Sequence, residues 1–235
     1  MFSGVSVGII TGLQVQKRSK KRVNVEIDGD FAFSLPLEEA AILKKGQSLT
    51  DDEVSALQAR DAMARAIDAA GRLLSLRPRS VHEIKQYLAR KEIPPMLMDD
   101  VIEHLTQMGY VDDRAFAAFW VQERSSNKPL SARALRFELR DKGIEKAIVD
   151  EVLADLDEIE SAVQAATGYT HKLRGMTQAE AKQKLYAFLA RRGFNSGVAR
   201  DAMKQVFEVI LQGEDADSFF AEPVSRFDVR DMTED

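Results

Sequence analysis

The chain has 235 residues, of which 45% are hydrophobic, so it is long enough for one large or two small domains with a buried core. The absence of cysteine excludes disulfides, cysteine-ligated zinc, iron–sulfur clusters and a thiol nucleophile. The net charge is −5, but residues 213–235 hold 8 acidic and 2 basic side chains, so the rest sums to only +1, which argues against a basic nucleic-acid-binding protein.

Membrane, secreted and metal-dependent classes are disfavoured on three grounds. There is no apolar run of about 18 residues, as a transmembrane helix would need. The first ten residues lack the pattern of a signal peptide. The only histidines are His82, His104 and His171, and their spacing fits no metal motif. We therefore expect a cytoplasmic protein without membrane contact, metal or cofactor.

The first 35 residues predict β-strands. β-Branched or apolar side chains recur at every second position over 7–15, 23–27 and 31–35. Such a small antiparallel sheet needs a helix packed against it to be stable. We expect that helix to begin at Pro36 and to end at Gly46, since proline favours helix starts and glycine favours helix ends.

The connection between the second and third strands carries the turn signal Asp28-Gly29. A two-residue loop there would place Val25 and Phe31 on opposite faces of the sheet. A three-residue loop at 27–29 pairs Val25 with Phe31 on one face, and this is the loop that we predict.

From Thr50 onward the sequence predicts helices. Thr50 to Glu53 form a capping box, and the helix that it opens is expected to run to about Leu74 because no proline intervenes. Similar boxes begin at Ser80 and Thr177.

An internal repeat organises the helical part of the chain. Residues 80–93, 131–144 and 181–194 align without a gap, at periods of 51 and then 50. The break after the aligned helix contains a glycine in the second and third copies, as a helix C-cap requires, but Glu92 in the first. The matching apolar sets are Ile84, Leu135 and Leu185; Leu88, Leu139 and Leu189; and Ile93, Ile144 and Phe194.

These patterns predict a mainly α fold with three tandem three-helix repeats in an elongated array behind a small N-terminal β-hairpin sheet. The expected divisions are 1–48 for the sheet and its short helix, 49–110, 111–156 and 157–212 for the repeats, and 213–235 for an acidic mobile tail.

No motif of an enzyme is present. The sequence has no P-loop, no Gly-x-Ser-x-Gly elbow and no His-Glu-x-x-His. The carboxylate pair at Asp112-Asp113 is explained by a helix N-cap rather than by metal binding. The pair at Asp99-Asp100 fits the solvent side of a helix.

Basic residues are the more informative candidates. Arg133, Arg136 and Arg140 are spaced at i, i+3 and i+7, which places them on one helix face away from the apolar stripe. The simpler alternative is a solvated face balanced by nearby carboxylates. Because other basic residues surround the matching helices, we predict a recurring basic strip that binds an acidic partner. The candidate residues are Arg77, Arg79, Lys85, Lys91, Arg124, Arg133, Arg136, Arg140, Lys142, Lys184, Arg191 and Arg192, with Lys17, Arg18, Lys20, Lys21 and Arg22 as candidates for nucleic-acid contact.

Three segments resemble the RecX family of bacterial regulators of the RecA recombinase. They are Leu-Leu-Ser-Leu-Arg-Pro-Arg-Ser at 73–80, Gly-Tyr-Val-Asp-Asp-Arg-Ala-Phe-Ala at 109–117 and Lys-Gly-Ile at 142–144. The resemblance covers about 61–210, and the N-terminal strands resemble an extension that some members carry. Glu92 departs from the family pattern, as does the acidic tail.

The resemblance implies a curved, elongated, non-enzymatic monomer without a cofactor that acts in recombination, DNA repair and the SOS response. It implies binding along the groove of a RecA filament on DNA, with inhibition of ATP hydrolysis and strand exchange, and at most weak contact with single- or double-stranded DNA. Two alternatives stay open: a protein that binds DNA directly through helix-turn-helix-like units, and an interaction solenoid with another partner.

Overall fold

The computed structural model describes residues 7–17, 20–213 and 216–222. The chain divides into two compact units, Met1–Arg79 with Ile84–Val111 and Ser80–Glu83 with Asp112–Asp235. Within the described residues, no helix combines the length and the apolar character needed to cross a bilayer.

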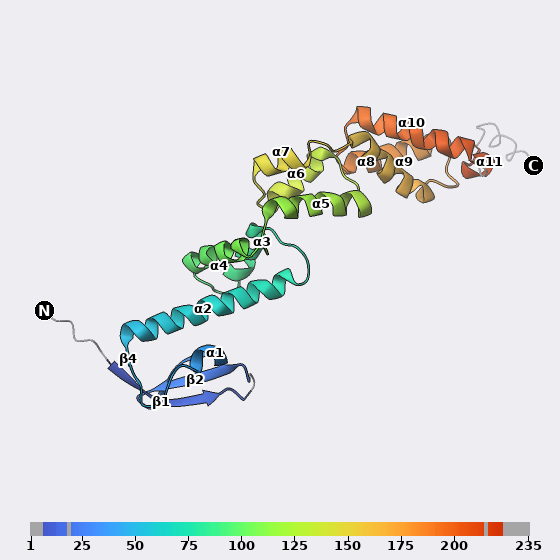
Figure 1. The fold of residues 1–235 in the computed structure, drawn as a ribbon. Helices are drawn as coiled ribbons and strands as arrows, with labels where there is room; N and C mark the ends of the chain where they lie inside the picture. Colours follow the sequence, from blue (N-terminus) through green and yellow to red (C-terminus); the bar gives the residue numbers. More distant parts are fainter. Residues whose placement is uncertain (1–6, 18–19, 214–215, 223–235) are drawn as a thin grey trace, which may run out of the picture. The chain divides into compact units, whose positions relative to one another are not determined.

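Figure 1 shows the elements in chain order. Those of the first unit are β1 (Val7–Val15), β2 (Arg22–Ile27), β3 (Asp30–Pro36), α1 (Leu37–Ala40), β4 (Ser48–Thr50), α2 (Asp51–Leu74), α3 (Val81–Ala89), whose first turn belongs to the second unit, and α4 (Pro95–Gln107). Those of the second unit are α5 (Asp113–Asn127), α6 (Ala132–Asp141), α7 (Lys146–Val152), α8 (Glu158–Tyr169), a 3₁₀ turn (Thr170–Lys172), α9 (Gln178–Arg191), α10 (Ser196–Gln212) and α11 (Ala216–Phe219).

The N-terminal strands form an antiparallel sheet in the order β3-β2-β1-β4. One face is apolar because alternate side chains point the same way, and it packs against α2, where Leu57 joins the same buried cluster. Arg22 on β2 reaches Asp61 on α2, with 2.8 Å between Nη2 and Oδ1. The N-terminal half of α2 is therefore part of the core of the sheet.

The hairpin between β2 and β3 differs from the expected three-residue loop. Its loop is Asp28-Gly29, with φ of 53° and 99°, and this two-residue turn matches the twist of the flanking strands. With this turn, a regular register would place Val25 and Phe31 on opposite faces. A β-bulge shifts the register, so that Glu26 pairs with Phe31 but Val25 pairs with Phe33. Phe33 is buried, whereas Phe31 is 64% exposed.

The helix expected from Pro36 to Gly46 is also wrong, because α1 spans only Leu37–Ala40. Instead of continuing the helix, two of the residues after it bond to the edge of β1. Gly46 N–H donates to the carbonyl of Ile10, and Ile10 N–H donates to the carbonyl of Gln47. Sheet pairing has displaced the later turns of this helix.

The helix opened by the Thr50 capping box is confirmed. Thr50 accepts from the N–H of Glu53, the Glu53 carboxylate accepts from the N–H of Thr50, and the helix continues to Leu74. The three-helix repeats are also confirmed, because the aligned leucine and isoleucine positions of all three copies are buried. These are Ile84, Leu135 and Leu185 in the first set and Leu88, Leu139 and Leu189 in the second.

The serines that begin α3 and α6 make comparable contacts within the second unit. Ser80 Oγ donates to the backbone carbonyl of Lys142 at 2.8 Å. The backbone N–H of Ser131 donates to the carbonyl of Arg192 at 3.2 Å. Each helix start thus rests on the turn that ends the aligned helix of the following repeat.

A glycine lies at each of these turns for a steric reason. Gly143 and Gly193 have φ of 77° and 89°. A Cβ added to Gly143 would lie 2.5 Å from His82, and one added to Gly193 would lie 2.5 Å from Ser131. In the first repeat the matching residue is Glu92, which adopts φ of 59° at an exposed position.

A second hydrogen bond accompanies each of these contacts. Val81 N–H donates to Asp113 on α5 at 2.8 Å, and Ala132 N–H donates to Glu158 on α8 at 3.0 Å. Burial raises the pKa of Asp113, although the bond from Val81 opposes that shift. In both places a carboxylate on the first turn of a helix satisfies the free N–H of another helix start.

The C-terminal segment corrects another expectation. Residues 216–222 do not form part of a mobile tail, because Phe219 is buried in the core of the third repeat. The ring of Phe220 stacks on Phe207, with 5.5 Å between centroids. Two adjacent phenylalanines supply enough apolar area to anchor an otherwise acidic segment. The rest of the expected tail, 214–215 and 223–235, lies outside the described residues.

Candidate partner-binding surface

Three arginines of α6 share one exposed face, as their spacing predicted. Together with Phe137 and Asp141, the three arginines, Arg133, Arg136 and Arg140, line a shallow hollow of about 590 Å³. The opposite face of α6 carries Leu135 and Leu139, which are buried. The amphipathic period of the helix therefore directs the arginines to solvent.

The three arginines on this face differ in whether they form an ion pair among the described residues. Arg136 Nε lies 3.5 Å from an oxygen of Asp150, which also binds Lys146 at 2.8 Å. The hydrogen bond from Lys146, with a smaller contribution from Arg136, lowers the pKa of Asp150. Neither Arg133 nor Arg140 forms an ion pair with any residue in the described part of the chain.

Phe137 was not among the residues that the sequence singled out. It lines the same hollow as the three arginines and is 75% exposed. The repeat alignment carries a signal that could have found it, because the same position is Gln86 in the first copy and Ala187 in the third. An aromatic residue at this position is specific to the second repeat.

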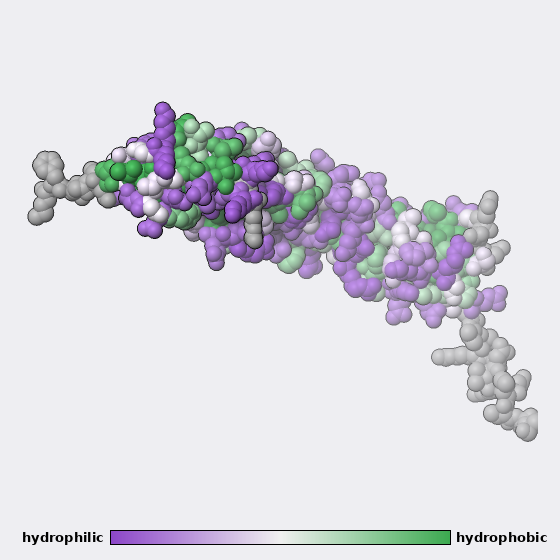
Figure 2. Space-filling view, turned by 90° about the horizontal axis from the view of Figure 1, so that it is seen from below, coloured by the Kyte–Doolittle hydropathy of each residue, from purple (hydrophilic) through white to green (hydrophobic). Residues whose placement is uncertain are grey.

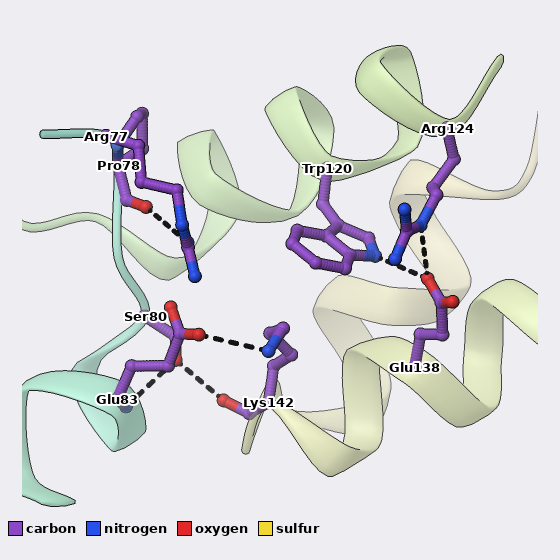
Figure 3. Close-up of polar contacts among 8 residues, drawn as sticks. All are labelled: Arg77, Pro78, Ser80, Glu83, Trp120, Arg124, Glu138 and Lys142. Atoms are coloured by element: carbon purple, nitrogen blue, oxygen red, sulfur yellow. Dashed lines mark hydrogen bonds and ion pairs between the residues drawn. The ribbon is translucent and has the colours of Figure 1, made fainter. Parts of the chain in front are cut away.

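Two other candidates, Arg124 and Lys142, are part of the structure of the second repeat. Figure 3 shows Glu138 accepting from Trp120 Nε1 at 2.8 Å and from Arg124 Nε at 2.7 Å. Lys142 Nζ lies 3.0 Å from Glu83 and 4.9 Å from the Trp120 ring centre. Both cations are held by partners within the chain.

None of the candidates of the third repeat lines the α6 hollow. Arg192 donates to the carbonyl of Pro129 at 2.9 Å and lies 4.6 Å over the ring of Phe188. Burial lowers the pKa of Arg192. Lys184 donates to the carbonyl of Lys172 at 3.3 Å. Arg191 is exposed.

In the first unit the candidates make local contacts. Lys85 on α3 pairs with Asp99 on α4 at 2.6 Å. Arg77 donates to the carbonyl of Pro78 at 2.9 Å (Figure 3). Lys91 is exposed and lies 5.8 Å from the ring centre of Tyr87. The buried Nε of Arg79 has no hydrogen-bond partner among the described residues.

The basic residues of the N-terminal sheet divide into two groups. Lys17, Lys20 and Lys21 are exposed. Arg22 is instead held by Asp61 and by Ser34, whose hydroxyl accepts at 2.8 Å. Arg18 lies outside the described residues.

The aligned positions of the first repeat carry the basic strip only in part. Arg136 matches Lys85, but Arg133 matches His82 and Arg140 matches Ala89. The position that is basic in all three copies, that of Lys142 and Arg192, makes contacts within the chain in the second and third repeats. The full set of three arginines on one helix face therefore occurs only in α6 among the three aligned helices.

Sequence models of RecX proteins match four successive parts of this chain. The regulatory protein RecX N-terminal domain matches residues 8–50, and the first, second and third RecX three-helix domains match 66–105, 112–153 and 156–203. The chain belongs to the RecX family of regulatory proteins.

Individual RecX proteins show the same relationship. Regulatory protein RecX of Chlorobium phaeobacteroides (strain BS1) is 41% identical over 143 residues, which cover 61% of this chain and 94% of that protein. Its counterpart in Bacillus pumilus (strain SAFR-032) is 30% identical over 204 residues, covering 85% and 78%. A crystal structure of regulatory protein RecX matches with a TM-score of 0.63 at 25% identity, covering 84% of this chain and 99% of the other.

Proposed function

We propose that this RecX-family chain is a non-enzymatic cytoplasmic regulator that binds the RecA filament on DNA and lowers its ATPase and strand-exchange activity. Family membership supports RecA as the partner. The observation that carries the binding surface is the exposed α6 face, on which Arg133, Arg136 and Arg140 surround one hollow.

Charge gives the physical reason for placing the contact there. Three exposed guanidinium groups, two of them without an ion pair among the described residues, attract an acidic surface during encounter and disfavour a basic one. A filament repeats its surface, so a chain of similar repeats can add many modest contacts along it. Neither step needs catalysis or a cofactor.

The test is the DNA-dependent ATPase of RecA, measured with and without a stoichiometric amount of the chain. We expect the wild type to lower the rate. The variant R133E/R136E/R140E should leave the rate at that of RecA alone, because reversed charges repel an acidic partner. Its helicity and melting temperature should match the wild type, since exposed pairs contribute less than about 1 kcal/mol each.

A charge-matched control separates this surface from net charge. Arg60, Arg90 and Arg200 are exposed and lie outside the α6 face. The variant R60E/R90E/R200E makes the same change in net charge and should lower the ATPase rate as the wild type does. If the wild type leaves the ATPase rate of RecA unchanged, the proposal that the chain regulates RecA is refuted. If R133E/R136E/R140E inhibits as fully as the wild type, the proposal that the α6 face makes the contact is refuted.

Direct DNA binding is tested in the same series. Fluorescence anisotropy with labelled single-stranded and duplex DNA, in the absence of RecA, should show weak, strongly salt-dependent binding. Tight binding of DNA alone near physiological salt would favour the helix-turn-helix alternative.

A further inference from the structure

Phe137 is the apolar side chain that lines the hollow of the arginine face. It is 75% exposed and lines the same hollow as Arg133, Arg136 and Arg140. Exposed apolar side chains are common in this chain, and Figure 2 shows hydrophobic patches between hydrophilic ones. Exposure alone therefore does not mark a binding residue.

The repeat alignment shows that the fold does not need an aromatic residue at this position. The matching residues are Gln86 and Ala187, in helices of the same repeat with the same buried leucines. Both glutamine and alanine have a higher helix propensity than phenylalanine. The core of the repeat therefore does not require an aromatic ring at this position, and helix propensity does not favour one.

The surroundings of Phe137 have the composition of a binding centre. Residues that dominate binding energy in protein interfaces are enriched in aromatic side chains and arginine, grouped at the middle of the contact. Here one ring and three guanidinium groups share a single hollow, and two of those groups have no ion pair among the described residues. The long arginine stems also add apolar area around the ring.

The charges on this face favour a protein segment over nucleic acid. Asp141 lines the hollow, and Asp150 lies beside Arg136. A nucleic-acid backbone carries a phosphate at every nucleotide, so these carboxylates would repel it. Carboxylates on a protein can be spaced to meet the arginines while an apolar side chain between them meets the ring.

We propose that Phe137 is the apolar anchor of this face and that its ligand is an acidic protein segment with an apolar side chain between its carboxylates. The inference rests on the proposed function in that the RecA surface would supply such a segment. It adds which side chains the bound segment carries and which residue of this chain contacts its apolar side chain.

The direct test uses defined probes and the full chain. One probe is a fluorescein-labelled peptide of glutamates around a central leucine, the second has glycine in place of that leucine, and the third is labelled oligothymidylate. We expect the wild type to bind the leucine peptide about tenfold more tightly than F137S does. The glycine peptide should bind wild type and F137S equally, because the apolar contact is then missing in both.

Two controls protect this result. F137S should melt like the wild type, since its side chain is mostly exposed, and F137L should retain most of the affinity. Y186S removes another exposed aromatic residue, on α9, and should bind the leucine peptide as the wild type does. The proposal is overturned if the wild type fails to bind the leucine peptide, if F137S binds it normally, or if oligothymidylate binding depends on Phe137.

A RecA arm separates this proposal from the proposed function. If the wild type and F137S lower the ATPase rate of RecA equally, Phe137 is not the anchor, but the proposed regulation of RecA is supported. If the leucine peptide binds through Phe137 but the wild type leaves the ATPase rate unchanged, Phe137 is an anchor, but the proposed regulation of RecA is wrong.

Discussion

Gly143 combines a left-handed backbone with a close neighbour, so its substitution should be costly. In G143A the left-handed conformation and the approach to His82 together should cost about 2 to 4 kcal/mol of unfolding free energy. The measurement is urea denaturation followed by the fluorescence of Trp120, the only tryptophan of the chain. E92G is the matched variant: it relieves a left-handed residue, and it should stabilise the first repeat by up to about 1 kcal/mol. Equal stability of G143A and wild type would contradict this steric account.

Glu138 should matter for stability and not for regulation. E138A leaves the indole N–H of Trp120 and the guanidinium of Arg124 without their acceptor, which should cost about 1 to 3 kcal/mol. E138Q, which keeps an acceptor oxygen, should cost less. Below its melting temperature, E138A should still lower the ATPase rate of RecA. If folded E138A no longer lowers the ATPase rate of RecA, Arg124 would have to be counted among the partner-binding residues.

Single residues show where sequence reasoning reached its limit. The spacing of Arg133, Arg136 and Arg140 was enough to place them on one exposed face, because helical periodicity is local. The roles of Lys142 and Arg192 depend on Glu83 and Pro129, which are about 60 residues away in sequence. No local pattern distinguishes such a held cation from an exposed one.

At the scale of elements, the capping boxes of α2 and α9 should make the protein sensitive to acid. Hydrogen bonds from Thr50 and Thr177 lower the pKa of Glu53 and Glu180 from 4.5 in the folded state. Their stabilisation is therefore complete above pH 4.5 and is lost as the pH falls through the lowered values. Circular dichroism should show helicity falling on acidification below about pH 4.5.

The variant E53Q/E180Q isolates this effect. It should be less stable than the wild type at neutral pH and should lose less helicity on acidification, because its caps do not titrate. Asp113 acts in the opposite direction, since burial raises its pKa, and it stays unchanged in both proteins. If both proteins lose the same helicity on acidification, carboxylates other than Glu53 and Glu180 cause the loss.

The helices were predictable and the sheet was less so. Buried leucines at a helical spacing, capping boxes and a 50-residue period identify α2 and the repeats from local sequence. The bulge near Glu26 and the shortening of α1 depend on pairing between separate segments, which the sequence does not show. The turn residues Asp28 and Gly29 are compatible with a two-residue or a three-residue loop between β2 and β3. The structure has the two-residue loop together with a bulge.

At the scale of the whole molecule, the N-terminal sheet should be needed for part of the first repeat. Deleting residues 1–48 removes the apolar face that covers Leu57 and the arginine that pairs with Asp61. Residues 49–235 should still unfold cooperatively in the second and third repeats, whereas amides in the first half of α2 should lose hydrogen-exchange protection. Retained protection there would show that α2 is stable without the sheet.

The C-terminal phenylalanines make a second prediction at this scale. A chain that ends at Gly213 loses the rings that pack on the third repeat, and its α10 amides should exchange faster. A chain that ends at Glu222 keeps those rings and should match the full chain. Similar hydrogen-exchange rates in both truncated chains would show that Phe219 and Phe220 add little to the stability of the third repeat.

The contact between a helix-starting serine and a glycine turn also limits how many copies of this unit one chain can join. An added copy before the first would need to rest on Glu92, whose Cβ would meet the added helix start as a Cβ at Gly143 or Gly193 would. An added copy after the third would have to receive α9, where Ala181 replaces the serine and the helix begins a turn earlier, at the cap formed by Thr177. Tandem duplication of the underlying gene segment would therefore not lengthen the protein productively unless both ends changed as well.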